Sequence, residues 1–235
     1  MLYLCECNNM IASMKKLEVC VESLESVKAA RSGGAHRIEL CAALSEGGVT
    51  PSHGMIEAAR RLGPEKLHVL VRARGGNFVY SADEVDCMVR DIEMCRSLGV
   101  DGVVVGALTP QGDIDLDACR RMVNAASGMQ VTFHRAFDCC NHPLEALEQI
   151  IALGCTRLLT SGQQDSAEQG IDLISKLVQQ AGDRIIIMPG AGVNENNAAH
   201  ILNATGACEI HGSIRTGNVT DPTKVKTLIS HINEK

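Results

Sequence analysis

No run of apolar residues in this 235-residue chain approaches the roughly 20 residues that a membrane-spanning helix requires. Residues 1–16 also lack the long apolar segment and small-residue cleavage site of a secretory leader. Positive charge is not in excess either, because 22 lysines and arginines are intermixed with 28 aspartates and glutamates, for a formal net charge of −6. Without a basic stripe, nucleic acid and anionic membranes are disfavoured as partners. We therefore expect a soluble, cytoplasmic protein that binds neither.

The chain also lacks linkers, low-complexity tracts and a sequence repeat of fixed length. Instead, short apolar runs alternate with helical patterns from Leu17 to the end. The expected strands are residues 17–21, 37–42, 67–72, 102–106, 130–134, 157–161, 185–189 and 208–212. The expected helices are residues 23–32, 52–62, 82–98, 115–126, 143–153, 166–181, 195–204 and 222–233.

Eight consecutive β/α units of this kind predict an α/β protein of the (β/α)8 TIM barrel class. We expect a single domain at residues 17–235, preceded by a frayed N-terminal extension at residues 1–16. An open, doubly wound sheet is the alternative, but even spacing without a break in composition favours closure. Serines stand where helix N-caps belong, at Ser23, Ser52, Ser81 and Ser166.

Cysteine is abundant but does not form a disulfide pattern. The 11 cysteines are odd in number and are spread over expected strands and helices, which favours reduced thiols. Cys5 and Cys7 form a Cys-x-Cys pair, but no second pair nearby completes a metal site. The adjacent Cys139 and Cys140 fall in an expected loop, where exposed thiols oxidise readily. The roles of these four cysteines stay open.

Two expected strands repeat a pattern in which a glutamate and a cysteine occupy alternate positions, Glu18 with Cys20 and Glu39 with Cys41. Because side chains alternate between the faces of a strand, each pair points to one side of the sheet. If the strands are parallel neighbours, about 4.8 Å apart, two in-register thiolates could share one Cu(I), a soft ion that few sulfur ligands satisfy. The alternative is a pair of unreactive buried thiols.

Further polar residues are expected at the carboxyl ends of the strands, where TIM barrels place their active sites. By strand alternation, Arg72 and Arg74 follow His68 and Leu70 on one face of the third strand, and His211 lies in the eighth. His134 ends the fifth strand and Asp138 follows it, and a carboxylate can hold an imidazole ready for acid–base catalysis. A network of buried ion pairs alone is the structural alternative. The candidates for catalysis or binding are Glu18, Glu39, Arg72, Arg74, His134, Asp138 and His211.

Two glycine-containing loops indicate an anion site. Gly190 and Gly192 follow the seventh strand, and Gly212 and Ser213 end the eighth. TIM barrels commonly hold a substrate phosphate at these loops, on backbone N–H groups and a helix start. Glycine also serves in ordinary tight turns, so the two loops together carry this prediction better than either alone. We therefore expect these four residues to bind a small anion.

Several unusual strings, in order along the chain, resemble the CutC family of copper homeostasis proteins. They are LEVC (17–20), GAHRIELC (34–41), EGGVTPS (46–52), RARGGNFVY (72–80), VTFHRAFD (131–138), LTSGQ (159–163) and MPGAGV (188–193). The resemblance implies a TIM barrel, self-association as dimers or tetramers, and a cytoplasmic or partly nuclear location. It also implies Cu(I) as the ligand, with Cys20 and Cys41 as the matching cysteines. The chain departs from the family pattern at residues 214–219, where a longer polar loop is replaced by a short segment.

Three functional hypotheses follow. The first is a copper homeostasis protein that binds Cu(I) through cysteine thiolates for cytosolic buffering or trafficking. The second is a TIM-barrel enzyme, of the lyase, isomerase or hydrolase type, that performs acid–base chemistry on a small anionic or phosphorylated substrate. The third is a scaffold whose pocket has no ligand. The arginines and glycine-rich loops favour an anion, whereas the resemblance favours copper.

Overall fold

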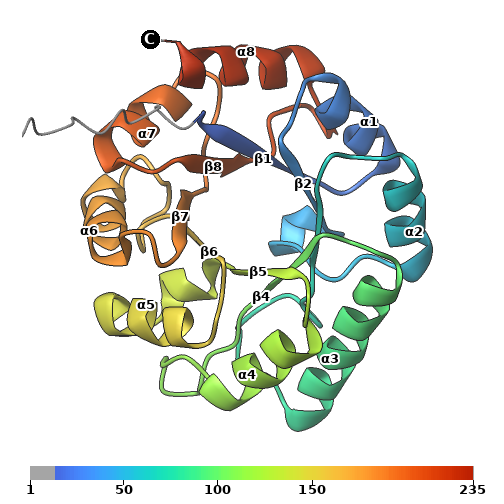
Figure 1. Ribbon diagram of the computed structural model, residues 1–235, viewed down its shortest axis with the longest axis vertical. Coiled ribbons are helices and arrows are strands. Elements are labelled where there is room, and N and C mark those ends of the chain that lie inside the picture. The colour runs from blue at the N-terminus through green and yellow to red at the C-terminus, as the bar shows by residue number, and fades with distance from the viewer. Residues whose placement is uncertain (1–13, 235) are drawn as a thin grey trace, which may run out of the picture.

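The computed structural model describes residues 14–234, so Cys5 and Cys7 lie outside the described residues. Within this range, eight parallel strands surround a central axis (Figure 1). They are β1 (Lys16–Val21), β2 (Arg37–Leu40), β3 (Leu67–Leu70), β4 (Gly102–Val105), β5 (Gln130–Phe133), β6 (Arg157–Thr160), β7 (Ile186–Pro189) and β8 (Glu209–Gly212).

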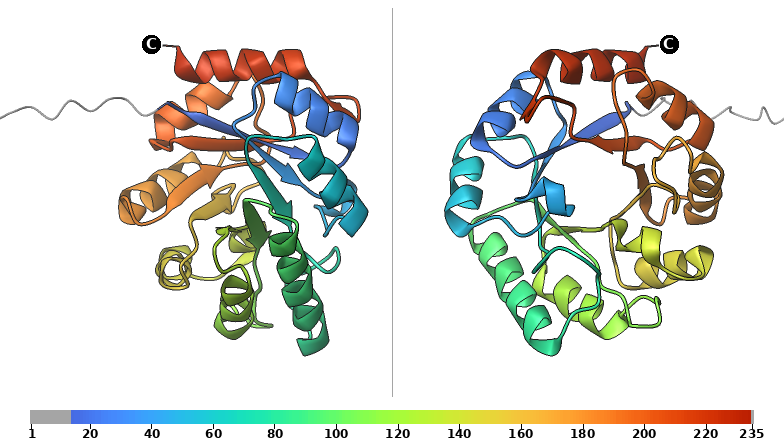
Figure 2. Two further views of the ribbon diagram at one scale, coloured as in Figure 1. Left: turned by 45° about the vertical axis from the view of Figure 1, so that its right-hand side comes forward. Right: turned by 180° about the vertical axis from the view of Figure 1, so that it is seen from behind.

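A helix follows each strand, and the helices form an outer ring around the strands (Figures 1 and 2). They are α1 (Leu24–Ser32), α2 (His53–Arg61), α3 (Ala82–Ser97), α4 (Leu116–Ala125), α5 (Pro143–Ala152), α6 (Ile171–Ala181), α7 (Ala198–Thr205) and α8 (Pro222–Asn233). Two 3-10 turns, η1 (Leu44–Glu46) and η2 (Arg135–Cys139), lie in the loops after β2 and β5. Between β8 and α8, the short segment forms a hairpin of β9 (Arg215–Thr216) and β10 (Val219–Thr220).

The strands pair in the order β7-β6-β5-β4-β3-β2-β1-β8, and β7 and β8 lie beside each other. The sheet is therefore a nearly closed barrel of a single domain, and the prediction of a TIM barrel is confirmed. Continuous apolar strands suit this architecture, because helices cover the outside of every strand. The open doubly wound sheet is excluded, since β8 pairs with β1 and also lies beside β7, the strand at the other end of the order.

The two faces of each strand contact different parts of the protein, the helix layer on the outside and the barrel interior on the inside. On β1, Leu17, Val19 and Val21 point outward into the large apolar core beneath the helices. Cys20 instead belongs to a small interior cluster with Cys41, Leu70 and Val104. The alternation read from the sequence is thus the alternation between the helix layer and the barrel interior.

Local signals position most helix starts. The side chains of Ser23, Ser52 and Ser81 each accept a backbone N–H in the first turn of α1, α2 and α3. Ser166 does not cap α6, because the helix begins at Ile171, five residues after Ser166, and its N-cap is Gly170. Ser166 instead accepts the N–H of Gln169 in the turn that precedes the helix.

The register between β1 and β2 differs from the sequence expectation. Cys20 stands opposite Glu39, and Glu18 stands opposite Arg37. The two cysteines are therefore diagonal neighbours rather than an in-register pair. Strands of a barrel are staggered relative to one another, and this stagger is a property of the closed sheet that no single strand encodes.

Candidate functional site

The amino-terminal end of the barrel interior holds a buried network of ion pairs. Arg37 of β2 donates to Glu18 of β1 and, at 2.5 Å, to Glu209 of β8. Arg157 of β6 donates to the same Glu209 at 2.7 Å. Every buried charge here has an opposite partner, as burial of ions in proteins requires. We call these four residues, Glu18, Arg37, Arg157 and Glu209, the ionic floor.

The floor keeps its charges at neutral pH. Burial by itself raises the pKa of Glu18, but the Arg37 guanidinium and a hydrogen bond with His211 hold that pKa well below its usual range. Burial likewise raises the pKa of Glu209, yet Arg157 and Arg37 bring it below the ordinary value. His68 of β3 lies 3.8 Å from Glu18, and burial lowers its pKa to about 4, so this imidazole is neutral.

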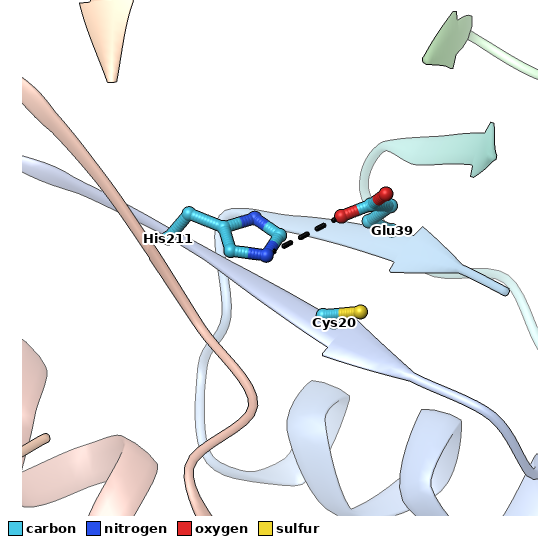
Figure 3. Close-up of side chains that lie close together, drawn as sticks. All are labelled: Cys20, Glu39 and His211. Carbon is cyan, nitrogen blue, oxygen red and sulfur yellow. Dashed lines mark ion pairs between the residues drawn. The ribbon is translucent and has the colours of Figure 1, made fainter. Parts of the chain in front are cut away.

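A path of polar side chains leads from the floor to the carboxyl ends of the strands. Glu18 Oε1 lies 2.8 Å from His211 Nδ1, and His211 Nε2 lies 3.4 Å from Glu39 Oε2. Figure 3 shows the ring of His211 turned toward the Glu39 carboxylate, with the side chain of Cys20 beside them. One ligand atom from each of Cys20, Glu39 and His211 lies within 4.8 Å of the others. Three neighbouring strands, β8, β1 and β2, thus bring a metal-ligating set together.

The two glutamates of this path differ in their ionisation. Burial raises the pKa of Glu39 to about 7, although the His211 imidazolium opposes that shift. Burial lowers the pKa of His211, but the carboxylates of Glu39 and Glu18 have the larger combined effect and leave it raised. Because Glu18 stays ionised while Glu39 titrates near neutral pH, the path contains one permanent anion and one group able to gain or lose a proton.

The thiols of Cys20 and Cys41 meet inside the barrel, with their Sγ atoms 3.6 Å apart. Cys41 Sγ also lies 3.5 Å from the carbonyl oxygen of Val21. The hydrogen bond with Cys41, together with burial, raises the pKa of the Cys20 thiol well above its usual value. Cys20 is therefore protonated at neutral pH unless a metal ion replaces the proton.

A cavity of about 120 Å³ lies above these groups, at the carboxyl ends of the strands. On one side Cys20, Glu39, Cys41 and His211 form what we call the thiol wall. A second group of lining residues, at and after the ends of β3, β5 and β6, forms what we call the arginine wall. The arginine wall comprises Leu70, Arg72, Phe78, His134, Arg135 and Leu159, and Leu44 and Gly47 complete the lining.

His134 is held in one orientation by its surroundings. Its Nδ1 accepts the backbone N–H of Ala136 at 3.2 Å, so the proton of the neutral ring resides on Nε2. A Cβ atom on Gly106, the residue after β4, would lie 2.6 Å from the ring, so a glycine there makes room for the imidazole. Burial and the charge of Arg72 lower the pKa of His134 to about 3, and the ring is neutral.

Arg72 is anchored by backbone oxygens instead of by a carboxylate. Its guanidinium donates to the carbonyls of Glu46 at 2.9 Å, Gly48 at 2.8 Å and Gly76 at 2.6 Å. The ring of Phe78 lies against it, with 4.8 Å from Arg72 Cζ to the ring centroid. These contacts fix a buried positive charge at the edge of the cavity.

The structure does not bring every candidate to the cavity. Arg74 turns outward and pairs with Glu84 of α3 at 2.6 Å, because the chain leaves the sheet after Leu70 and strand alternation no longer applies. Asp138 does not contact His134; it pairs with Arg135 at 2.7 Å and accepts from Ser161 and Thr160. Gly190, Gly192, Gly212 and Ser213 do not line this cavity, and their role in binding an anion stays a prediction.

Comparison with known proteins relates this site to a family. The sequence model of the CutC family matches residues 15–216. A CutC family protein of Bacteroides thetaiotaomicron is 54% identical over 211 residues, which cover 88% of this chain and 85% of the relative. The chain belongs to the CutC family. A second CutC family protein, from Pasteurella multocida, is 50% identical over 196 residues, covering 83% of this chain and 80% of the relative.

Solved structures agree with this membership. A crystal structure described as that of a candidate copper homeostasis protein CutC, from Streptococcus agalactiae, has a TM-score of 0.82 at 35% identity. It covers 85% of this chain and 99% of its own chain. Thiamine phosphate pyrophosphorylase of Pyrococcus furiosus has a TM-score of 0.64 at 17% identity, over 93% of this chain and 96% of its own. The latter likeness shows the barrel fold alone.

Membership in the CutC family confirms the resemblance read from the sequence motifs. Self-association and a cytoplasmic or nuclear location stay predictions. Within residues 14–234, no helix has both the length and the apolar character to cross a bilayer.

Sequence reasoning missed several residues that shape the site. Arg37 shares the strand alternation of Glu39 and Cys41, and that parity could have placed it in the barrel interior. Phe78 and Arg135 lie in loops, where no periodic signal exists to show that they face the cavity. Cys140, expected in an exposed loop, is 7% exposed, because the loop packs its side chain against the core.

Proposed function

We propose that this CutC family protein binds one Cu(I) between Cys20 and Cys41 and buffers or transfers copper. The observation that supports the proposal best is the pair of thiols, 3.6 Å apart, at the edge of a cavity at the carboxyl ends of the strands. Thiolates are the ligands that Cu(I) prefers among protein side chains. Copper is cargo in this proposal and is not required for the fold.

The spacing of the thiols suits a shared ion. A metal–thiolate bond is about 2.3 Å long, taking the value for zinc, so two sulfur atoms 3.6 Å apart can both reach one ion. His211 offers a nitrogen near Cys20, and Glu39 offers a carboxylate oxygen. A soft, monovalent ion needs few ligands, and the two thiolates supply most of its coordination.

Binding requires that the thiols lose their protons. Because the pKa of Cys20 is raised well above its usual value, metal binding has to release a proton from this group. Glu39 lies beside Cys20 and has a pKa raised to about 7 by burial. This carboxylate is the nearest group able to accept such a proton at neutral pH.

An anaerobic titration with Cu(I) against a competing chelator tests the proposal. We expect about one Cu(I) per chain in the unaltered protein and loss of high-affinity binding in Cys20→Ser and Cys41→Ser. Cys87→Ser is the matched control, since Cys87 is exposed on α3 and does not line the cavity. Undiminished copper binding by the two wall variants would show that the ion is held elsewhere.

A second function is supported by the path of Glu18, His211 and Glu39, which sets one ionised carboxylate and one titratable carboxyl on either side of an imidazole. This arrangement suits acid–base catalysis on a small anionic or phosphorylated substrate. His211→Gln in such an enzyme is expected to lower kcat by about 100-fold or more. A screen of small anions for stabilisation of the metal-free protein would identify substrates to assay.

A further inference from the structure

The arginine wall contains a charge that the protein itself does not neutralise. Arg72 is only 4% exposed, and across residues 14–234 no carboxylate lies within ion-pair distance of it. Its hydrogen bonds go to three carbonyl oxygens, and its Nε–H has no partner among the described residues. Carbonyl dipoles stabilise a cation only in part, so a buried guanidinium of this kind favours an anion beside it.

A second donor on the same wall also lacks a partner. His134 is 5% exposed and lines the cavity, and its Nε2 has no hydrogen-bond partner in the described part of the chain. Since Nδ1 accepts the N–H of Ala136, Nε2 carries the proton and is a donor. A buried N–H without an acceptor is destabilising, and a ligand oxygen would relieve that cost.

Phe78 aligns the two donors and gives the wall an apolar part. Its ring packs on the Arg72 guanidinium at 4.8 Å and on the His134 ring at 5.0 Å between centroids. Leu70 and Leu159 line the same cavity. Arg135 contributes little free charge, because Asp138 neutralises it at 2.7 Å. Two N–H donors without partners therefore lie among the residues of this wall, beside hydrocarbon.

We propose that the arginine wall binds a small organic anion whose carboxylate or phosphate oxygen accepts hydrogen bonds from Arg72 Nε–H and His134 Nε2–H. The hydrocarbon part of the anion packs against Phe78, Leu70 and Leu159. The proposal specifies residues and a ligand class for the acid–base enzyme that is the second proposed function. Its biological role rests on that proposed function, whereas anion binding itself does not. The two donors of this site, Arg72 and His134, are not the thiols that the copper proposal uses, although Leu70 packs against Cys20 and Cys41 in the same cavity.

Isothermal titration of the metal-free, full-length protein tests the site. The probes are butyrate for a carboxylate with a hydrocarbon part and inorganic phosphate for the alternative head group. Butyramide is the uncharged control, and chloride at matched ionic strength controls for screening. We expect saturable binding of butyrate or phosphate and none of butyramide. The head group that binds more tightly identifies the ligand class, and absence of saturable binding of either anion overturns the proposal.

Variants of the two donors make the test specific. His134→Asn retains an acceptor for Ala136 but removes the Nε2 donor, and Arg72→Gln removes the charge. We expect each to weaken anion binding about tenfold or more. Arg74→Gln is the matched control, because Arg74 does not line the cavity. Unchanged affinity in a folded His134→Asn variant, as judged by circular dichroism, contradicts the assignment even if Arg72→Gln does not fold.

The copper proposal can fail independently of this one. A Cys20→Ser/Cys41→Ser double variant is expected to lose Cu(I) and to keep its affinity for the anion within about twofold, since serine is close in size to cysteine and both substitutions leave the donors Arg72 and His134 in place. Loss of anion binding in that variant would overturn the separation of the two walls. Anion binding by a protein that takes up no Cu(I) would overturn the copper proposal alone.

Discussion

The ionic floor and the arginine wall both contain arginines buried inside the barrel, but the groups that surround the positive charge differ. On the floor, Arg37 is 5% exposed and pairs with Glu18 and Glu209. On the wall, Arg72 is 4% exposed and, within the described residues, meets carbonyl oxygens and an aromatic ring instead of a carboxylate. The two arginines are equally buried, but only Arg37 is neutralised by carboxylates of the protein. Arg37 therefore has a structural role, whereas Arg72 can pair with the anionic group of a ligand.

The histidines differ in the same way. His68, near the floor, is fully buried away from the cavity, whereas His134 lines it. Each ring lies against a glycine, His68 against Gly102 in β4 and His134 against Gly106, the residue after β4. The barrel thus accommodates two neutral imidazoles by the same steric device, but only one of them can reach a ligand.

Breaking the floor is expected to have the largest effect on stability. Arg37→Met leaves Glu18 without its guanidinium and Glu209 with one fewer partner, both still buried. Removing one member of a buried ion network typically costs about 3–5 kcal/mol, measured as the free energy of unfolding in urea. Arg184→Met, which breaks the exposed pair with Glu148, is the control and should have a much smaller effect. Similar losses for both variants would show that the floor does not act as a buried network.

A second test compares the two histidines through the glycines beside them, Gly102 in β4 and Gly106 just after β4. In Gly106→Ala the new Cβ would lie 2.6 Å from the His134 ring, and in Gly102→Ala it would lie 2.5 Å from His68 Nε2. Overpacking of this kind costs about 1–3 kcal/mol, so both variants should unfold at lower urea concentration. Only Gly106→Ala displaces a cavity residue, and only this variant should lose affinity for butyrate. An equal loss of affinity in Gly102→Ala would remove the distinction between the two histidines.

The smallest expected effect is on the pH dependence of stability. Burial and Arg72 lower the pKa of His134 to about 3 in the folded protein, against about 6.5 in an unfolded chain. Between these values the unfolded state binds the additional proton, so this group reduces stability as the pH falls from about 6.5 toward 3. His134→Asn should therefore lose less stability than the unaltered protein between pH 7 and pH 5, measured by urea unfolding. An identical loss in both proteins would mean that the ring is not held neutral.

The sequence predicted the repeating unit of this fold better than its three-dimensional contacts. Alternation along β1 and β2 correctly separated Leu17 and Val19, which face the helices, from Cys20 and Cys41, which face the interior. The same rule placed Arg74 with Arg72, but Arg74 turns outward to Glu84. Side-chain alternation holds only while the backbone is extended in the sheet, and β3 ends at Leu70.

Contacts between distant segments could not be read in advance. Arg37 meets Glu209 across a separation of 172 residues, and nothing near either residue in the chain indicates the pairing. Asp138 was a candidate partner for His134, yet η2 directs it to Arg135 and Ser161. Such pairings depend on the positions of whole elements, which local spacing does not contain.

The sequence by itself determined the order of the β/α units, the inward direction of the glutamates and cysteines, and the family, because these depend on periodicity and on strings of neighbouring residues. Only the tertiary structure decided that Cys20 lies opposite Glu39. It also decided that carboxylates neutralise the arginines of the floor, whereas no carboxylate among the described residues pairs with Arg72. The physical reason is the stagger of strands in a closed barrel, which selects among many possible neighbours the few that meet.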